Sequence, residues 1–254
     1  MKVPHVNGFL CSIFDSVLSN GRINYMVSEY RVEIGKHVSN VVFASKWAKD
    51  LVTFDKQPEI VEVVHHEVPA NTMFVKPVNL PSDYAFFVSD VQPRKNPDLW
   101  YMTIKKLKFK VLAVTKPEWC AKLSQLPNFK CIGYFGQVPH ETLNAYMARA
   151  RLFLWMTGGE GFGLPPLEAS WMGVFPVAQD IPPLNEWFPS DLRKHLVKPK
   201  FQTTAGSFLR GSPYVVFKYD PNEFAEVANQ LFYDNLTEVR KALRDYVDEN
   251  YTRG

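Results

Sequence analysis

From residue 84 onward, short segments of continuously apolar residues alternate with longer segments of helical periodicity. Strands that are apolar on both faces are typical of parallel sheets covered by helices, so this alternation predicts a doubly wound α/β sheet. The predicted strands comprise residues 84–88, 110–114, 129–135, 152–155, 174–178 and 214–217. Ligands of such sheets bind beyond the carboxyl ends of the strands, and we expect the functional site at that edge.

Capping residues and prolines mark where the intervening helices begin. Asn96 is the expected N-cap of a helix that starts at Pro97, and Pro117 and Pro139 open two more. Further helices are predicted at residues 165–172, 221–233 and 236–251. Residues 198–212 are rich in Gly, Ser, Thr and Lys, which predicts a long loop.

The first 75 residues carry fewer elements, with strands predicted at 40–43 and 59–64 and a helix at 46–52. This is too little for a second complete Rossmann-like domain. We therefore expect a shortened N-terminal region followed by a complete Rossmann-like domain and a C-terminal helix that packs back on the N-terminal region. The expected boundaries are 1–78, 79–235 and 236–254.

Composition narrows the class of protein. The chain has 254 residues, of which 46% are hydrophobic, and a net charge of +3 that is too small to indicate a nucleic-acid partner. Cys11, Cys120 and Cys131 are scattered without a Cys-x-x-Cys pair, which favours a reducing compartment and no disulfide framework. No apolar stretch reaches the length of a membrane span, so the expected location is cytoplasmic.

One run of residues carries most of the functional signal. Glu160 and Glu168 bracket a glycine-flanked aromatic and a double proline, between the predicted strand 152–155 and the predicted helix 165–172. The glycines permit close approach of a ligand to the backbone, and a helix N-terminus offers N–H groups and a positive dipole end to a phosphate. Carboxylates at such a site can accept hydrogen bonds from sugar hydroxyls. Together these parts would fit a nucleotide-sugar.

Taken singly, two glutamates near a helix start are common and need no ligand. The complete run, continued by Ala169, resembles the Glu-x7-Glu signature of retaining GT-B glycosyltransferases, specifically the glycosyltransferase family 4 group. The resemblance implies a GT-B-like fold with a shortened N-terminal region. By the resemblance, Glu160 would be the catalytic residue that holds donor sugar hydroxyls, and Glu168 would bind the ribose. Backbone N–H groups for the donor would come from Gly161, Phe162, Gly163 and Leu164.

Other segments resemble the same family in the same order. Residues 92–96 resemble the segment whose lysine contacts the donor diphosphate, which points to Lys95. The family's second basic residue would stand at position 89 or 90, where this chain has Ser and Asp, and Arg94 is the candidate replacement. Residues 135–138 resemble the segment that borders the nucleotide base, which adds Val138 to the donor-binding candidates. His5 resembles an acceptor-side position.

The implied reaction moves a hexosyl group from a UDP- or GDP-sugar to an acceptor hydroxyl, with retention and with no metal or other cofactor. The sequence holds no Asp-x-Asp pair, in agreement with metal independence. The acceptor, whether glycan, lipid or protein, is left open. Two other functions stay open: a non-catalytic nucleotide-sugar-binding subunit that needs a partner, and a GT-B nucleotide-sugar epimerase.

Three further features were weighed. Residues 65–67, His-His-Glu, are expected to be solvated and not to hold metal, because neighbouring strand residues face opposite sides. Residues 181–186 resemble a family segment that ends in a glutamate, and a ligand role and a capped helix start are equally weighted for Glu186. The lysines between 105 and 110 and the loop 208–210 leave peripheral membrane contact open. A homodimer or a partner chain also stays open.

Overall fold

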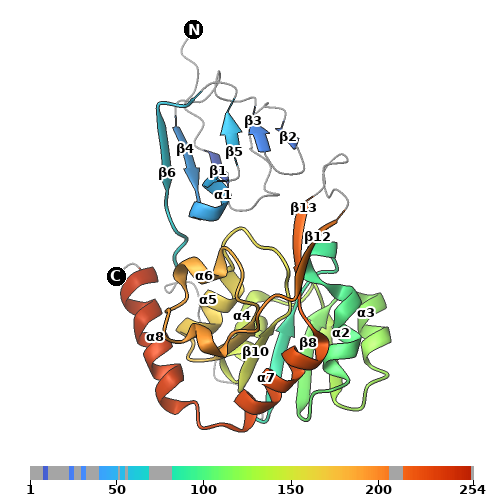
Figure 1. Ribbon diagram of the computed structural model, residues 1–254. Helices are drawn as coiled ribbons and strands as arrows, with labels where there is room; N and C mark the ends of the chain where they lie inside the picture. Colours follow the sequence, from blue (N-terminus) through green and yellow to red (C-terminus); the bar gives the residue numbers. More distant parts are fainter. Residues whose placement is uncertain are drawn as a thin grey trace.

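The computed structural model describes residues 8–10, 23–25, 30–32, 40–50, 52–54, 57–68, 82–205 and 214–252. These residues form a small N-terminal region of short strands above a larger α/β domain (Figure 1). His5 and the loop 208–210 lie outside the described residues, so the expectations for them stay predictions.

The larger domain is built on a parallel sheet of five strands in the order β11-β10-β7-β8-β9. The strands are β7 (Tyr84–Val88), β8 (Lys110–Thr115), β9 (Phe129–Tyr134), β10 (Leu152–Trp155) and β11 (Phe175–Ala178). The first strand of this sheet in the sequence, β7, lies in its middle. β8 and β9 follow on one side of β7, and β10 and β11 then lie on the other side. The predicted Rossmann-like sheet is confirmed. Because β7 and β10 are neighbours, their carboxyl ends form the switch point at which such sheets bind ligands.

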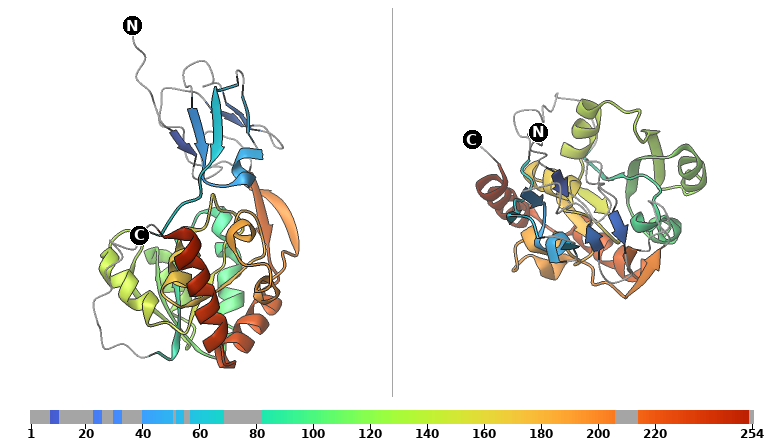
Figure 2. Two further views of the ribbon diagram at one scale, coloured as in Figure 1. Left: turned by 90° about the vertical axis from the view of Figure 1, so that its left-hand side faces the viewer. Right: turned by 90° about the horizontal axis from the view of Figure 1, so that it is seen from above.

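Helices cover the sheet in the α/β manner that the sequence predicted (Figures 1 and 2). They are α2 (Pro97–Ile104), α3 (Pro117–Leu123), α4 (His140–Ala148), α5 (Leu164–Trp171), the short α6 (Leu184–Trp187), α7 (Pro221–Tyr233) and α8 (Thr237–Tyr251), with two 3₁₀ turns, η1 (Pro93–Lys95) and η2 (Arg193–His195). The helices α2, α3 and α7 begin at a proline, and α4 begins directly after Pro139. Among the described residues, no helix is both long and apolar enough to cross a membrane.

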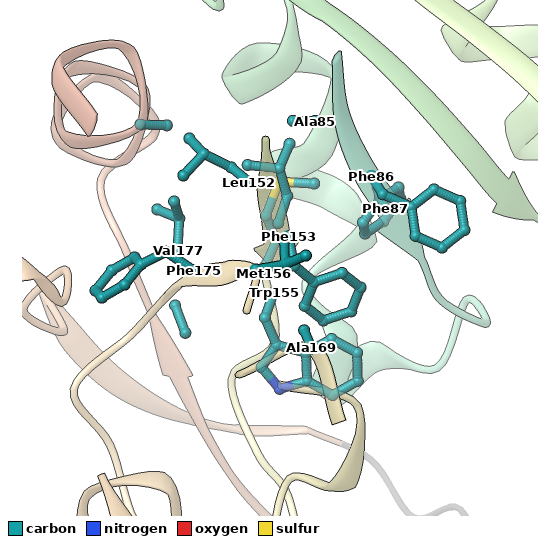
Figure 3. Packing of buried hydrophobic residues seen from close by; sticks show 14 of the residues in the cluster. Ala85, Phe86, Phe87, Leu152, Phe153, Trp155, Met156, Ala169, Phe175 and Val177 are labelled. Atoms are coloured by element: carbon teal, nitrogen blue, oxygen red, sulfur yellow. The ribbon is translucent and has the colours of Figure 1, made fainter. Parts of the chain in front are cut away.

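The core explains why the strand segments are continuously apolar. All four residues of β10 are buried, since helices pack on both of its faces. Figure 3 shows Phe86 and Phe153 from neighbouring strands in this core, with ring centroids 6.4 Å apart. Phe153 also stacks on Trp155, the last residue of β10, at 5.6 Å. The aromatic packing therefore extends to the edge where the strand ends.

Two expectations about residues 198–217 are wrong. Residues 214–217 do form a strand, β13 (Tyr214–Lys218), but it pairs antiparallel with β12 (Phe201–Ala205) and lies outside the five-stranded sheet. The predicted loop 198–212 therefore contains a strand. β-branched Thr203 and Thr204 suit a strand, and the polar composition of the segment concealed this preference.

The expectation of no disulfide is also wrong, because the structure joins Cys120 of α3 to Cys131 of β9. Their Cα atoms are 5.6 Å apart, a separation that a disulfide can bridge. The count of cysteines says nothing about the packing of α3 against β9, which brings the two residues together. The residues between them are the end of the helix and the turn into the strand.

Asn96 precedes α2 as predicted, but its side chain makes no cap hydrogen bond. Its backbone is left-handed, with φ 55°, and its Nδ2 donates to the carbonyl of Phe217 in β13 at 3.0 Å. Asn96 therefore ties the start of α2 to the β12–β13 hairpin, a contact with a residue far along the chain that capping rules do not consider.

The N-terminal region holds two small sheets. β1 (Gly8–Leu10), β4 (Asn40–Phe43) and β6 (Ile60–Val63) form one parallel sheet. β2 (Ile23–Tyr25), β3 (Tyr30–Val32) and β5 (Val52–Phe54) form a mixed sheet, in which β3 pairs antiparallel with β2 and parallel with β5. The predicted helix 46–52 is α1 (Lys46–Asp50), which is shorter because Val52 already belongs to β5.

The last described residue of the N-terminal region, Val68, meets the end of α8. The backbone N–H of Val68 donates to the carbonyl of Tyr251 at 2.7 Å, and Val68 forms a bridge with Thr252. Along the rest of its length α8 lies against the larger domain, where Trp171 Nε1 of α5 donates to Asp248 at 3.0 Å (Figure 2). The segment that leaves the N-terminal region is thus fixed to the end of α8.

Candidate functional site

The strongest candidates from the sequence meet at the switch point. Lys95 lies in η1 after β7, and Glu160 lies in the loop after β10. Lys95 Nζ is 2.5 Å from Glu160 Oε1, and both side chains are largely buried. Two neighbouring strands therefore bring together residues that are 65 positions apart in the sequence.

Arg94 completes this cluster. Its Nη1 is 3.1 Å from Glu160 Oε2, and the same nitrogen donates to the carbonyl of Gly159 at 2.9 Å. Its Nε donates to Gln92 Oε1 at 2.9 Å. The guanidinium is thus held in place from three directions, and one carboxylate faces two cations. Both cations face Glu160 in a place that is mostly shielded from water, and the Asp90 carboxylate also acts on Lys95.

Thr157 is a member of the site that the sequence did not single out. Its hydroxyl donates to Glu160 Oε1 at 2.7 Å, beside the Lys95 contact. Thr157 comes two residues after β10 and three before Glu160, so its place on the same loop was the signal that could have found it. It fixes the rotamer of the carboxylate that the sequence puts at the centre of the chemistry.

The charges in the cluster shift each other's pKa. Burial is the strongest influence on Glu160 and raises its pKa, but Lys95, Arg94 and Thr157 together hold the pKa below its ordinary value. Burial lowers the pKa of Lys95, and the Glu160 carboxylate opposes that effect. Lys95 Nζ also lies 4.4 Å from the centroid of the Trp155 ring, a cation–π contact at the end of β10.

Glu168 stands apart from this cluster, on the second turn of α5. Burial raises the pKa of its carboxyl to about 7. At neutral pH the group is therefore divided between its acid and its carboxylate. In one form it can donate a hydrogen bond and in the other it can only accept, and both are useful toward a hydroxyl.

The loop between β10 and α5 approaches its neighbours closely. A Cβ atom on Gly158 would lie 2.1 Å from the carbonyl oxygen of Phe217, and Gly163 has φ 94° just before α5 begins. Phe217 N donates to the Gly158 carbonyl at 2.8 Å, so the β12–β13 hairpin holds the start of the loop. These glycines are needed for close packing and for a left-handed turn, respectively.

The first turn of α5 has fewer backbone N–H groups than the sequence analysis expected of a helix N-terminus. Pro165 and Pro166 have no N–H and occupy the first turn of α5. Donors for a ligand must therefore come from the loop, at Gly161, Phe162 and Gly163, and from Leu164, the first residue of α5. Phe162 is only 2% exposed as a whole residue, so its ring is part of the core and not of a ligand-binding surface.

Val138 lies farther along the edge of the sheet, after β9. Its side chain is packed so closely to Gly133 that a Cβ there would be 2.3 Å from Val138 Cγ2. Tyr134 and Phe135 are exposed beside it, and Lys116 Nζ lies 5.6 Å from the Phe135 ring centroid. The structure therefore adds exposed aromatic surface to the segment that the sequence associated with a nucleotide base.

The structure corrects the expectation for His65 and His66. β6 ends at Val63, so the alternation of strand residues does not apply to them. Both rings are half-buried against Phe162, with centroids 5.4 and 5.6 Å from its ring. The Glu186 carboxylate accepts hydrogen bonds from the backbone of α1, so it caps a helix other than its own, and its ligand role stays a prediction.

A separate hollow of about 510 Å³ lies between the end of α2 and α7, away from the residues described above. Lys106, Lys108 and Tyr233 line it. Asn229 bridges the two lysine backbones, accepting from Lys108 N at 2.8 Å and donating to Lys106 O at 3.0 Å. These contacts explain the hollow as a packing groove between elements.

Comparison with known proteins identifies the family of this chain. Residues 70–207, more than half of the chain, match the family Glycosyl transferases group 1. The chain belongs to this family, and its fold is the GT-B type that the sequence predicted. Comparison with curated proteins finds no match.

Solved structures with the same fold are distant in sequence. Sucrose-phosphate synthase from Thermosynechococcus elongatus is 17% identical, with a TM-score of 0.64 over 86% of this chain and 56% of that one. HepE from Anabaena, solved with UDP, is 12% identical, with a TM-score of 0.61 over 86% of this chain and 61% of that one. The GtfA/B complex has a chain that is 18% identical, with a TM-score of 0.57 over 85% of this chain and 43% of that one. This chain therefore spans less than two thirds of the length of each.

Proposed function

We propose that this chain transfers a sugar from a nucleoside diphosphate sugar to an acceptor hydroxyl, with retention of the anomeric configuration and without a metal ion. The observation that carries the proposal is the pairing of Lys95 and Arg94 with Glu160 at the carboxyl ends of two neighbouring strands. A lysine and an arginine side by side at this edge are suited to hold the two phosphates of a nucleoside diphosphate.

The charge that develops in the reaction falls where these cations lie. The bond between the anomeric carbon and the diphosphate oxygen breaks, and the electron pair leaves with the diphosphate. Lys95 and Arg94 stabilise that charge, which is the task of a divalent ion in other transferases. The acceptor oxygen bonds to the anomeric carbon from the face that the diphosphate leaves, and its proton passes to a departing phosphate oxygen. Retention follows from this shared face.

Glu160 and the loop hold the donor in this scheme. Once the diphosphate engages the two cations, the Glu160 carboxylate accepts from hydroxyls of the donor sugar and faces the positive charge of the anomeric centre. Glu168 binds the ribose hydroxyls, and the backbone N–H groups of residues 161–164 meet the sugar and the phosphates. Val138 and the aromatic surface beside it border the base.

UDP-hexoses are the first donors to test. HepE was solved with UDP and with UDP-glucose, and its chain has the same fold as this one. GDP-sugars are the alternative that the sequence left open. The acceptor class stays open among glycan, lipid and protein.

A second candidate is a nucleotide-sugar-binding subunit that acts only with a partner. The observation that favours it is the match to a chain of the GtfA/B complex, a structure of two proteins together. Binding would then be present in the isolated chain, and turnover would appear only on addition of a partner. An epimerase would differ from both because it would change the donor sugar without any acceptor.

The test is a panel of UDP- and GDP-sugars measured by ligand-observed NMR, with Lys95→Ala and Lys130→Ala beside the unmodified chain. Lys130 is an exposed lysine of β9, so it matches the loss of charge without touching the site. We expect binding of one donor, loss in Lys95→Ala and no change in Lys130→Ala. With an acceptor, release of nucleoside diphosphate and the anomeric proton coupling of the product report transfer and retention. Failure of every donor to bind would overturn the proposal.

A further inference from the structure

The first turn of α1 is capped by two residues, one that directly precedes it in the chain and one that is far from it in the sequence. Ser45 precedes the helix, and its Oγ accepts from Ala48 N at 3.1 Å. The Glu186 carboxylate accepts from the two donors that precede Ala48, Lys46 N at 2.8 Å and Trp47 N at 2.6 Å. The first N–H groups of a helix have no partner inside it and are normally satisfied by residues next to it in the chain. Here most of the cap comes from α6 of the other region, 140 residues away.

The contact is strong for its size. One ionised carboxylate bridges two consecutive N–H groups, each oxygen taking one, and faces the positive end of the helix. The Glu186 side chain is 19% exposed, so water screens the contact only in part. The turn that it caps is anchored in its own region, since Ser45 and Ala48 are buried.

Glu186 also touches the segment that leads out of the N-terminal region. His65 Nε2 lies 3.8 Å from Glu186 Oε2. The His65 ring packs between Phe162, at a centroid distance of 5.4 Å, and Tyr251, at 6.0 Å. One carboxylate thus contacts the first turn of α1 and also His65, which packs against Phe162 in the loop after β10.

The residue after Glu186 fixes that same loop. Trp187 is fully buried, and its Nε1 donates to the carbonyl of Phe162 at 3.1 Å. Its ring also lies 6.5 Å from that of Phe162. Two consecutive residues of α6 therefore hold opposite sides of the junction: Glu186 holds α1, and Trp187 holds the Gly-Phe-Gly loop beside Glu160.

We propose that Glu186 is a positioning residue for sugar transfer: through α6 it sets the orientation of the N-terminal region over the loop that carries Glu160. The inference rests on the proposed function for its catalytic consequence. An acceptor held by the N-terminal region reaches the anomeric carbon only if that region has a fixed distance and angle to the donor. Errors of about 1 Å in such alignment cost roughly a hundredfold in rate. We call the contact between Glu186 and the first turn of α1 the clasp. The donor itself contacts the other domain, so its binding does not need the clasp.

The test compares Glu186→Ala and Glu186→Gln in the full chain, with Glu118→Ala as the control. Glu118 is an exposed glutamate in the first turn of α3, so the control loses the same charge at a helix start far from the junction. We expect Glu186→Ala to speed amide hydrogen exchange in residues 46–49 by about tenfold or more, while the peptide of β10 is unchanged. Glu186→Gln keeps one carbonyl oxygen as an acceptor, so its exchange rate in residues 46–49 should lie between those of the unmodified chain and of Glu186→Ala.

A second pair of variants breaks the contact from the other side. Lys46→Pro removes one of the two N–H donors at a helix position that accepts proline, and Lys46→Ala keeps the N–H while losing the same side chain. Faster exchange in residues 47–49 in the proline variant alone would assign the effect to the backbone contact with Glu186. Equal exchange in both variants would contradict it.

Activity provides the final readout. We expect kcat to fall at least about tenfold in Glu186→Ala and less in Glu186→Gln, while the affinity for a nucleoside diphosphate stays within about twofold. Unchanged exchange in Glu186→Ala would overturn the clasp, and faster exchange with unchanged kcat would overturn its positioning role. If the unmodified chain binds no donor, the proposed function fails, and hydrogen exchange still decides whether the clasp exists.

Discussion

The loop after β10 and the helix α5 each carry one glutamate of the same nine-residue run, and the two carboxyls have opposite surroundings. Glu160 on the loop faces Lys95, Arg94 and the hydroxyl of Thr157. Glu168 on the helix is affected mainly by burial. The pKa of Glu160 is therefore held below its ordinary value, whereas that of Glu168 rises to about 7.

This difference shows how position alone assigns two tasks to one residue type. A carboxylate that stays ionised between cations is suited to facing positive charge at an anomeric centre. A carboxyl near its midpoint at neutral pH is suited to exchanging hydrogen bonds with hydroxyls. Because the two environments differ, removing the charge of Glu160 and removing that of Glu168 should change the free energy of unfolding with opposite signs.

The largest expected effect comes from Glu160→Gln, which keeps the shape of the side chain and removes its charge. We expect turnover to fall by about a thousandfold, or ~4 kcal/mol, because the anomeric centre loses its facing carboxylate. Nucleoside diphosphate affinity should stay the same or rise, since Lys95 and Arg94 lose their protein counter-ion. Steady-state kinetics and calorimetry measure the two quantities.

The matched control is Glu226→Gln, which changes an exposed glutamate on α7. It should leave both turnover and affinity unaltered. Full turnover in Glu160→Gln would remove the catalytic role and with it the contrast between the two glutamates.

The contrast in pKa predicts opposite dependences of stability on pH. Glu168 has a folded-state pKa of about 7 against an ordinary value of 4.5, so its neutral form favours the folded state. The stability that it contributes is complete below pH ~4.5 and is lost as pH rises to ~7, a change of about 3 kcal/mol. Glu168→Gln stays neutral, so its unfolding free energy should gain on that of the unmodified chain between pH 5 and pH 8, roughly by this amount.

Urea unfolding at the two pH values measures that gain. Glu160 provides the reversed case, because its lowered pKa contributes stability above its ordinary pKa, which is lost as pH falls through the folded-state value. Glu160→Gln should therefore lose stability relative to the unmodified chain at neutral pH. The same sign of change in both variants would break the comparison.

Lys95→Ala tests the other partner of the pair. The ammonium group meets Glu160 in the free protein and a diphosphate in the proposed complex. We expect the dissociation constant for the nucleoside diphosphate to rise about thirtyfold, or ~2 kcal/mol, the size of a charge-assisted hydrogen bond. Calorimetry with UDP and GDP measures it. A change below about twofold would show that Lys95 serves Glu160 and not the donor.

The sequence predicted the parts of this molecule that depend on local pattern. The five strands of the parallel sheet lie within one or two residues of their expected bounds, because continuously apolar segments have few alternatives in a chain of this composition. The order of the strands was not predicted and comes from the structure. The approach of Lys95 to Glu160 could be anticipated once β7 and β10 were taken as neighbours, since both residues follow those strands.

What the sequence could not give are the contacts between segments far apart in the chain. Nothing in the pattern around Glu186 indicates that it caps a helix near residue 46, because capping rules consider only neighbouring residues. His65 and His66 were expected in solvent because a strand was extended past its end. The pairing of β12 with β13 was missed because a polar composition was read as a loop.

The smallest expected effect concerns Arg94, which the sequence offered as a replacement for a basic residue of the family. Its guanidinium contacts Gln92, Gly159 and Glu160 at the same time, an arrangement that needs a planar group with several donors. Arg94→Lys keeps the charge and loses this geometry, so the positive charge for a diphosphate remains while its placement becomes less defined. We expect nucleoside diphosphate affinity to fall by about threefold and turnover by about tenfold, because turnover depends on alignment more than binding does. Calorimetry and kinetics on the same sample separate the two. Equal losses in both would mean that Arg94 acts only through its charge, and that Lys95 and Arg94 are interchangeable counter-ions of Glu160.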